Sequence, residues 1–255
     1  MNQLIDFFKR KKILFKLLNF SLLRFLFKRI NIKILNYKKN FGYFYIILPR
    51  HLNYYFNNSY EEETFKFIKK LSTKHDLKNF FIDVGANVGV YSLYFKKNFN
   101  SKIIAFEPDE KNYKLIKSTI NQNKFKNFYL KKICLSNKNS SKKFLIDDIR
   151  GMTGSLSNKR NTIQLHQRLK TYKVVKTYKF DDIFKLKEKI FSIKIDVENH
   201  ELEVIDGMIE NIKKFKPLLI IESNSQNIKS LKKKLNKLNY RCKLIKKNSN
   251  YVFYH

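Results

Sequence analysis

The chain has 255 residues, of which 43% are hydrophobic, and this composition excludes an intrinsically disordered protein and fits one α/β domain with an extension. Its formal net charge of +33 is typical of proteins that bind nucleic acids. However, Lys, Asn, Ile and Phe are all abundant and Trp is absent, as codons rich in A and T would dictate. We therefore expect a solvated basic surface and do not expect nucleic acid as a partner.

The N-terminal residues 1–35 are rich in Leu, Ile and Phe, but basic residues interrupt every apolar run. Because no uncharged stretch reaches the length of about 18 residues, we do not expect a transmembrane helix. The order of charges does not fit a signal peptide either. Two interpretations stay open: a basic amphipathic helix on the inner membrane face or against a partner, and a pair of helices packed on the remaining chain. We favour the helix pair. Residues 41–51 predict a strand or hairpin, followed by a polar, aromatic loop.

From residue 61 onward the hydrophobic pattern alternates between helical and strand periods. Strands are expected at residues 80–83, 102–107, 128–135, 173–177, 190–197, 218–222, 242–245 and 251–254. Helices are expected at residues 61–71, 90–97, 112–123, 180–184, 201–213 and 225–238. Residues 136–172 are polar and show no clear period. This alternation predicts a mostly parallel sheet covered by helices on both faces, closed by an antiparallel pair of strands.

A glycine-containing turn follows the first of these parallel strands. Gly85, Asn87 and Gly89 stand at alternate positions, so the turn departs from the Gly-x-Gly-x-x-Gly pattern of dinucleotide sites. Asp83 stands two residues before the first glycine, where its carboxylate would repel a pyrophosphate. A carboxylate there suits a cationic ligand, such as one with an ammonium group. The turn therefore predicts a nucleotide-like ligand with a cationic end, and not NAD.

Glu107 ends the second parallel strand, at the spacing from the turn where an acid accepts hydrogen bonds from ribose hydroxyls. A ligand with a cation at one end and a ribose at the other is S-adenosylmethionine. The turn and Glu107 together predict a site for this cofactor.

Three blocks of the sequence, residues 83–89, 105–108 and 193–201, resemble the signature blocks of the FkbM-type methyltransferases, and lesser similarities occur at residues 60–61, 176–182 and 216–222. The resemblance extends from about residue 60 to residue 222. It implies a Rossmann-like class I methyltransferase fold, with a mostly parallel seven-stranded sheet, helices on both faces and a C-terminal antiparallel hairpin. It also implies S-adenosylmethionine as the methyl donor and, usually, O-methylation of a sugar, a polyketide or another small hydroxylated substrate.

Carried over by position, the resemblance implies a set of cofactor-binding residues. The methionine end would be held by Asp83, Gly85, Asn87 and Gly89. The ribose would contact Glu107, which Pro108 follows in the same block, and Leu135 and Ser136 would flank the adenine. Asp196 would lie beside the transferred methyl group, with Glu198 near the substrate. One position departs from the family pattern: Asn199 stands where the family has Gly, and Asn tolerates the left-handed backbone conformation better than most residues.

Asp196, Glu198 and His200 alternate at the end of a strongly apolar strand and are our candidate catalytic residues. A hydroxyl acceptor benefits from a base that takes its proton in the transition state. The alternative is that Glu198 caps the following helix and that His200 is a surface residue. Asp196 and Glu198 could also bind Mg²⁺ through oxygen, although nothing in the sequence requires a metal.

These patterns divide the chain into an N-terminal basic extension at residues 1–58 and a catalytic domain at residues 59–255. We expect the protein in the cytoplasm, where Cys134 would be a buried thiol, with peripheral contact to the inner membrane face as an additional expectation. The leading function is O-methylation of a sugar hydroxyl in a surface glycan or glycolipid, or of another small hydroxylated metabolite. The alternatives are an RNA or DNA methyltransferase and a catalytically inactive, membrane-associated relative.

Overall fold

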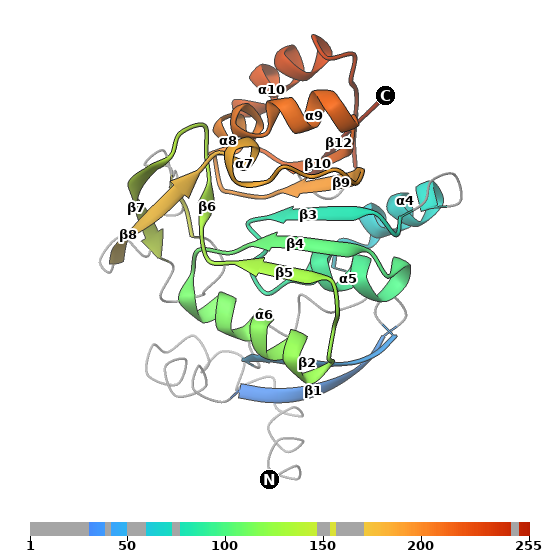
Figure 1. The fold of residues 1–255 in the computed structure, drawn as a ribbon. Coiled ribbons are helices and arrows are strands. Elements are labelled where there is room, and N and C mark those ends of the chain that lie inside the picture. The colour runs from blue at the N-terminus through green and yellow to red at the C-terminus, as the bar shows by residue number, and fades with distance from the viewer. Residues whose placement is uncertain are drawn as a thin grey trace, which may run out of the picture.

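The computed structural model describes residues 31–38, 42–49, 60–72, 77–146, 154–156, 171–245 and 250–255, with the backbone alone for the first two segments. Its centre is a seven-stranded sheet with the strand order β11-β12-β10-β9-β3-β4-β5 (Figure 1). The strands are β3 (Phe80–Val84), β4 (Lys102–Phe106), β5 (Phe128–Lys131), β9 (Ile190–Ile195), β10 (Leu218–Glu222), β11 (Arg241–Leu244) and β12 (Asn250–Tyr254).

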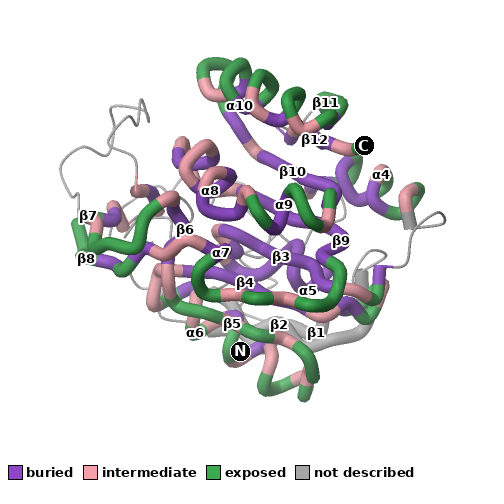
Figure 2. Tube along the Cα trace, turned by 45° about the horizontal axis from the view of Figure 1, so that its top comes forward, coloured by how far each residue is buried: buried purple, intermediate pink, exposed green. Residues whose placement is uncertain are grey.

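The central strands pair in parallel, whereas β12 is antiparallel to both of its neighbours. The predicted seven-stranded sheet with a C-terminal antiparallel hairpin is therefore confirmed. Every residue of β3 and β9 is buried, as expected for strands that helices cover on both faces (Figure 2). Successive side chains of these strands enter opposite layers of the core.

One layer of the core contains side chains of α4 (Glu62–Ser72), α5 (Val90–Phe99) and α6 (Glu110–Gln122). The other contains side chains of the helices α7 (Phe180–Ile183), α8 (Glu201–Gly207), α9 (Ile209–Phe215) and α10 (Asn227–Asn236). The single helix predicted at residues 201–213 is thus two helices. They divide after Gly207, where a Cβ atom would overlap the backbone carbonyl of Ser136. Close packing against the neighbouring chain explains why a glycine stands at this position.

A second, three-stranded sheet lies beside the carboxyl ends of β3, β4 and β5 (Figure 1). Its order is β6-β8-β7, with β6 (Cys134–Leu135), β7 (Ser140–Ile146) and β8 (Thr171–Tyr178). The prediction of one continuous strand at residues 128–135 was therefore wrong, because pairing with β4 ends at Lys131 and Cys134 pairs with Thr177 instead.

The strand β7 falls in the segment for which the sequence showed no period. Among its residues only Phe144 is buried, so an alternating apolar pattern could not develop. The strand forms because β8 pairs with it along its whole length, from Ser140 to Ile146.

Near the N-terminus, β1 (Asn31–Lys38) and β2 (Gly42–Pro49) form an antiparallel hairpin, and β2 lies next to α6. This confirms the strand predicted within residues 41–51 and corrects the helix predicted to include residues 31–35. The remainder of that helical prediction, residues 1–30, lies outside the described residues, and the domain division at residue 58 stays a prediction. Within the described residues no helix is both long enough and apolar enough to cross a bilayer.

Candidate active site

A cavity of about 260 Å³ opens at the carboxyl ends of β3, β4, β9 and β10. This edge is where open α/β sheets bind their ligands. The structure brings eight of the predicted site residues to its wall: Gly85, Asn87, Glu107, Pro108, Leu135, Asp196, Glu198 and His200. Asp83, Gly89 and Ser136 do not line it.

The turn after β3 reaches the cavity because Gly85 packs directly against the end of β9. Gly85 has a φ of +79°, and a Cβ atom at this position would overlap the carbonyl oxygen of Asp196. The N–H groups of Gly85 and Ala86 both donate to the carbonyl oxygen of Phe106, at 3.1 and 3.0 Å. Gly85 thus supplies both the left-handed backbone and the close approach that this turn requires.

Glu107 is held at the cavity wall by two backbone N–H groups. Its Oε2 accepts from the N–H of Asn87 at 2.7 Å, and its Oε1 accepts from the N–H of Asp109 at 2.8 Å. The residue is 5% exposed, and burial raises the pKa of its carboxyl group to about 8. These contacts orient the carboxyl group next to the turn, as the predicted ribose contact requires.

Asp83 has a different surrounding from the one we expected. Its Oδ2 accepts from the backbone N–H of Ser92 at 3.0 Å and from the Ser92 hydroxyl at 2.6 Å. The residue is 2% exposed, and burial raises the pKa of its carboxyl group to about 6. Asp83 therefore attaches the first turn of α5 to β3 and lies behind the cavity wall. Its contact with a ligand stays a prediction.

The segment after β9 carries the three predicted catalytic residues. Glu198 and Asn199 both have left-handed backbones, with φ of +53° and +73°. The left-handed turn that the family places at its Gly is thus present with Asn199. The N–H of Asn199 donates to Oε1 of Glu201, the first residue of α8, at 2.8 Å, which ties this turn to the start of the helix. Ser155 reaches this segment from the other side, because its hydroxyl donates to the carbonyl of Glu198 at 2.7 Å.

His200 is 6% exposed, so the alternative that made it a surface residue was wrong. Its Nε2 lies 3.0 Å from the hydroxyl oxygen of Ser136, and its Nδ1 lies 3.5 Å from a carboxylate oxygen of Glu203. Lys142 donates to the same hydroxyl oxygen at 3.2 Å. Burial lowers the pKa of His200, which keeps the ring neutral. With both nitrogens engaged, His200 fits a positioning role better than that of a base, and its predicted catalytic role stays a prediction.

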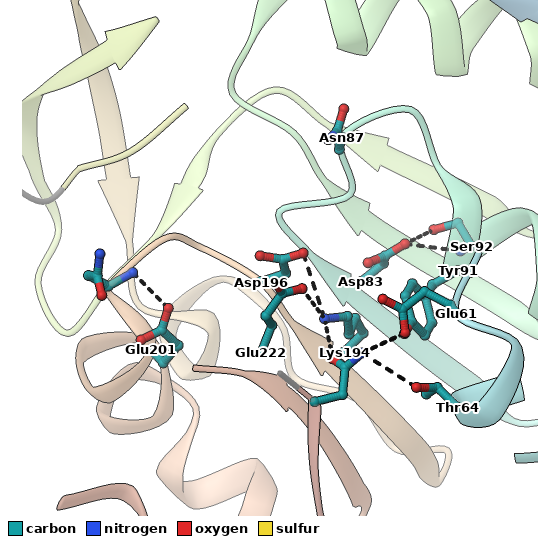
Figure 3. A network of polar contacts seen from close by, with 12 residues as sticks. Glu61, Thr64, Asp83, Asn87, Tyr91, Ser92, Lys194, Asp196, Glu201 and Glu222 are labelled. Atoms are coloured by element: carbon teal, nitrogen blue, oxygen red, sulfur yellow. Dashed lines mark hydrogen bonds and ion pairs between the residues drawn. The ribbon is translucent and has the colours of Figure 1, made fainter. Parts of the chain in front are cut away.

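Two further residues belong to this site, Lys194 and Glu222, and neither was among the residues predicted from sequence. Glu222, the last residue of β10, lines the cavity. Lys194 is 2% exposed, and its Nζ lies 3.7 Å from Oδ2 of Asp196 and 3.7 Å from Oε2 of Glu222 (Figure 3). The signal was present in the sequence, because a lysine between two isoleucines in a buried strand needs a partner.

A polar network beneath the cavity fixes Lys194 (Figure 3). Its Nζ donates to Oδ1 of Asn250 at 3.0 Å and lies 5.1 Å from the centre of the Tyr91 ring. Asn250 and the Tyr91 hydroxyl each donate to Oε2 of Glu61, at 2.6 and 2.8 Å. Burial lowers the pKa of Lys194, but the negative charges of Asp196 and Glu222 outweigh this effect and raise it overall. Lys194 is therefore a charged group held at a fixed position under the two carboxyl groups.

The last feature of the site is its capacity to hold a metal ion. Among the described residues, no group of three or more His, Cys, Asp and Glu side chains is arranged to hold a metal ion. Cys134 and Cys242 are free thiols, and Cys134 is buried as predicted. The sequence required no metal, and the binding of Mg²⁺ through Asp196 and Glu198 stays an open alternative.

The sheet order with one reversed strand near its edge, together with a cavity at the carboxyl ends of the parallel strands, defines a Rossmann-like methyltransferase. The profile of the family described as "Methyltransferase FkbM domain" matches residues 83–242. The chain belongs to the FkbM methyltransferase family.

A solved structure of another methyltransferase supports this fold assignment. The methyltransferase FkbM from Methylobacillus flagellatus KT is similar with a TM-score of 0.52 at 14% identity, and the match covers 70% of this chain and 44% of that chain. This chain thus corresponds to less than half of the length of that protein. The N-terminal domain of human METTL16 in complex with SAH is similar with a TM-score of 0.44 at 14% identity, over 91% of this chain and 77% of that chain. A search of curated proteins gave no significant match.

Proposed function

We propose that the protein transfers the methyl group of S-adenosylmethionine to a hydroxyl group of a small, polar acceptor, with a sugar of a surface glycan or glycolipid as the leading candidate. The observation that carries this proposal is that the turn at Gly85, the carboxyl group of Glu107 and the carboxyl groups of Asp196, Glu198 and Glu222 line one cavity. A cofactor held at the turn would therefore meet its acceptor beside several potential bases.

In the proposed arrangement, the residues of the wall divide between donor and acceptor. Glu107 would accept the ribose hydroxyls, and Gly85 and Asn87 would bring the backbone close to the methionine end. Leu135 would contact the adenine through its apolar side chain. Because Asp196 lies directly beside Gly85, it would lie next to the sulfonium, where a negative charge favours the cationic donor.

The chemistry required of the protein is positioning and removal of one proton. The acceptor oxygen must lie in line with the methyl group, and holding it there supplies much of the rate. Methylation of a hydroxyl group releases its proton, which a carboxylate at the cavity wall can accept. The resemblance to enzymes that usually O-methylate sugars, polyketides and other small hydroxylated compounds supports an acceptor of this class.

A labelled-methyl transfer screen tests the proposal. Purified protein and S-adenosylmethionine with a labelled methyl group would be incubated with glycan, glycolipid, RNA and DNA fractions in parallel. The Glu107→Ala variant serves as the negative control, and Glu110→Ala, at a partly exposed acid three residues away that does not line the cavity, as the matched positive control. We expect label in a methyl ether of a sugar after acid hydrolysis. Label confined to RNA, DNA or protein nitrogen would contradict the proposal.

A further inference from the structure

We infer that Glu222 is the general base of the methyl transfer. It acts beside Asp196, and the buried Lys194 holds both carboxyl groups in place. Glu222 lies at the end of β10, next to the strand whose end carries Asp196. The inference deepens the proposed function and rests on it, since it names the group that receives the proton of the acceptor.

The first support for this inference is the position of the two acids relative to Lys194 and the cavity. Asp196 and Glu222 both reach into the cavity, and their oxygen atoms lie at the same distance of 3.7 Å from the single Nζ of Lys194 (Figure 3). The side chain of Glu222 is 43% exposed and that of Asp196 is 35% exposed, whereas Lys194 is 2% exposed. An acceptor can therefore touch the two carboxyl groups but not the lysine.

The relative positions of the two acids assign their roles. The backbone of Asp196 packs against Gly85, so Asp196 lies on the donor side of the cavity. Glu222 belongs to the next strand, farther from the turn, and so faces the space left for the acceptor. A base must lie within hydrogen-bonding reach of the acceptor hydroxyl, and Glu222 satisfies this requirement without displacing the donor.

The charges around Glu222 make it a stronger base than an ordinary glutamate. The negative charge of Asp196, burial and a hydrogen bond with Asp196 raise the pKa of Glu222 to about 8, while Lys194 opposes the shift. Glu61, which directly precedes α4, adds a further negative charge, and the Tyr91 hydroxyl on α5 donates to Glu61 instead of to Glu222. A base with a pKa near the working pH combines an adequate ionised fraction with a strong tendency to take a proton.

The chemical step then balances without a further reactant. The acceptor oxygen forms a bond to the methyl carbon while the bond between that carbon and sulfur breaks. The electron pair of the broken bond stays on sulfur, which converts the sulfonium to a neutral thioether. The proton of the hydroxyl group passes to a carboxylate oxygen of Glu222. Lys194 retains its proton throughout and keeps both acids in place.

Glu222→Gln is the decisive variant, because it preserves the shape of the side chain and removes the base. We expect its affinity for S-adenosylhomocysteine to stay within about twofold of the wild type, and its kcat to fall by about 10²- to 10³-fold. The rise of the wild-type rate with pH, centred near 8, should disappear. Glu222→Asp should retain part of the turnover and the pH-dependent rise. Glu210→Gln, an exposed acid paired with Lys213, is the matched control and should behave as the wild type.

A direct titration of Glu222 gives a readout that needs no acceptor. Carbon-13 NMR of the glutamate carboxyl groups, with Glu222→Gln to assign the signal, should show a midpoint near 8. A midpoint in the ordinary range near 4 to 5 would contradict the inference. Full turnover by a folded Glu222→Gln protein would also contradict the inference while leaving O-methylation intact. A wild type that methylates only nitrogen acceptors would instead overturn the proposed function, and the assignment of Glu222 as base would fall with it.

Discussion

The carboxyl group of Glu107 accepts the backbone N–H of Asn87 at 2.7 Å, and this hydrogen bond ties the end of β4 to the turn that follows β3. The second oxygen accepts the N–H of Asp109 at 2.8 Å. Because each carboxylate oxygen can accept two hydrogen bonds, Glu107 has capacity for two ribose hydroxyls without displacing either N–H. One residue thus both shapes the turn and faces the cavity.

The raised pKa of Glu107 predicts a pH-dependent contribution to stability. Its carboxyl group titrates near 4.3 in the unfolded chain and at about 8 in the folded protein. As pH rises from about 4.5 to 8, the unfolded chain releases a proton that the folded protein retains, so this contribution to the free energy of unfolding is lost. We expect the stability of the wild type relative to Glu107→Gln to fall between pH 5 and pH 8.

Urea denaturation at pH 5, 6.5 and 8, at constant ionic strength, measures this difference. Comparison with the variant cancels the effect of the large net charge on both proteins. Glu110→Gln provides the control, because Lys132 lowers the pKa of Glu110 and its titration lies below the window. A difference between wild type and Glu107→Gln that stays constant or grows with pH would contradict the account.

Gly85 and Gly89 both have positive φ, but only Gly85 lacks space for a side chain. Gly85→Ala would push a methyl group into the carbonyl of Asp196, in addition to the cost of the left-handed backbone. At Gly89 a Cβ atom would lie 3.4 Å from Ile116, an ordinary contact, so Gly89→Ala should cost only about 1–2 kcal/mol. We expect Gly85→Ala to be the more destabilised protein in urea denaturation. Equal losses for the two variants would show that the packing of Gly85 against Asp196 is looser than described.

Asn199 adopts a left-handed backbone at a position where the family has Gly. Asn199→Gly and Asn199→Ala both remove the hydrogen bond between the side chains of Asn224 and Asn199, so their difference isolates the strain of the backbone. We expect Asn199→Gly to be more stable than Asn199→Ala by about 1 kcal/mol. Urea denaturation of the two variants measures this difference, and an Asn199→Ala protein at least as stable as Asn199→Gly would contradict it.

The inner strands of the central sheet, β3, β4, β9 and β10, could be predicted from sequence because they are short, largely apolar runs that end at acids or turn residues. Ile190–Ile195 is buried along its whole length, and its apolar character does not depend on the neighbouring chain. The small sheet could not be predicted in the same way. The strand β7 buries only Phe144, and its formation depends on pairing with β8, which no local pattern encodes.

The same distinction between local sequence patterns and tertiary neighbours applies to the residues of the site. Gly85 and Glu107 could be placed because backbone geometry and strand ends restrict where such residues occur. Asp83 was expected to meet a cationic ligand because of its charge and its place before the turn, and the structure adds a contact with Ser92 on the following helix that the sequence did not indicate. Glu222 could not be predicted because an acid at the end of a strand carries no specific sequence signal. Its role emerges only from the pairing of β9 with β10 and from the position of Lys194 between Asp196 and Glu222. The contacts of Asp83 and Glu222 therefore depend on neighbours that the fold supplies and that the local sequence does not reveal.

Isothermal titration calorimetry with S-adenosylhomocysteine tests most directly whether the cavity beside Glu107 holds the cofactor. We predict one binding site in the wild type and the same affinity in Glu110→Ala. In Glu107→Ala the affinity should fall by about 10- to 100-fold, because two hydrogen bonds to the ribose, of about 0.5–1.5 kcal/mol each, are lost. No binding by the folded wild type, or wild-type affinity in a folded Glu107→Ala protein, would contradict the account.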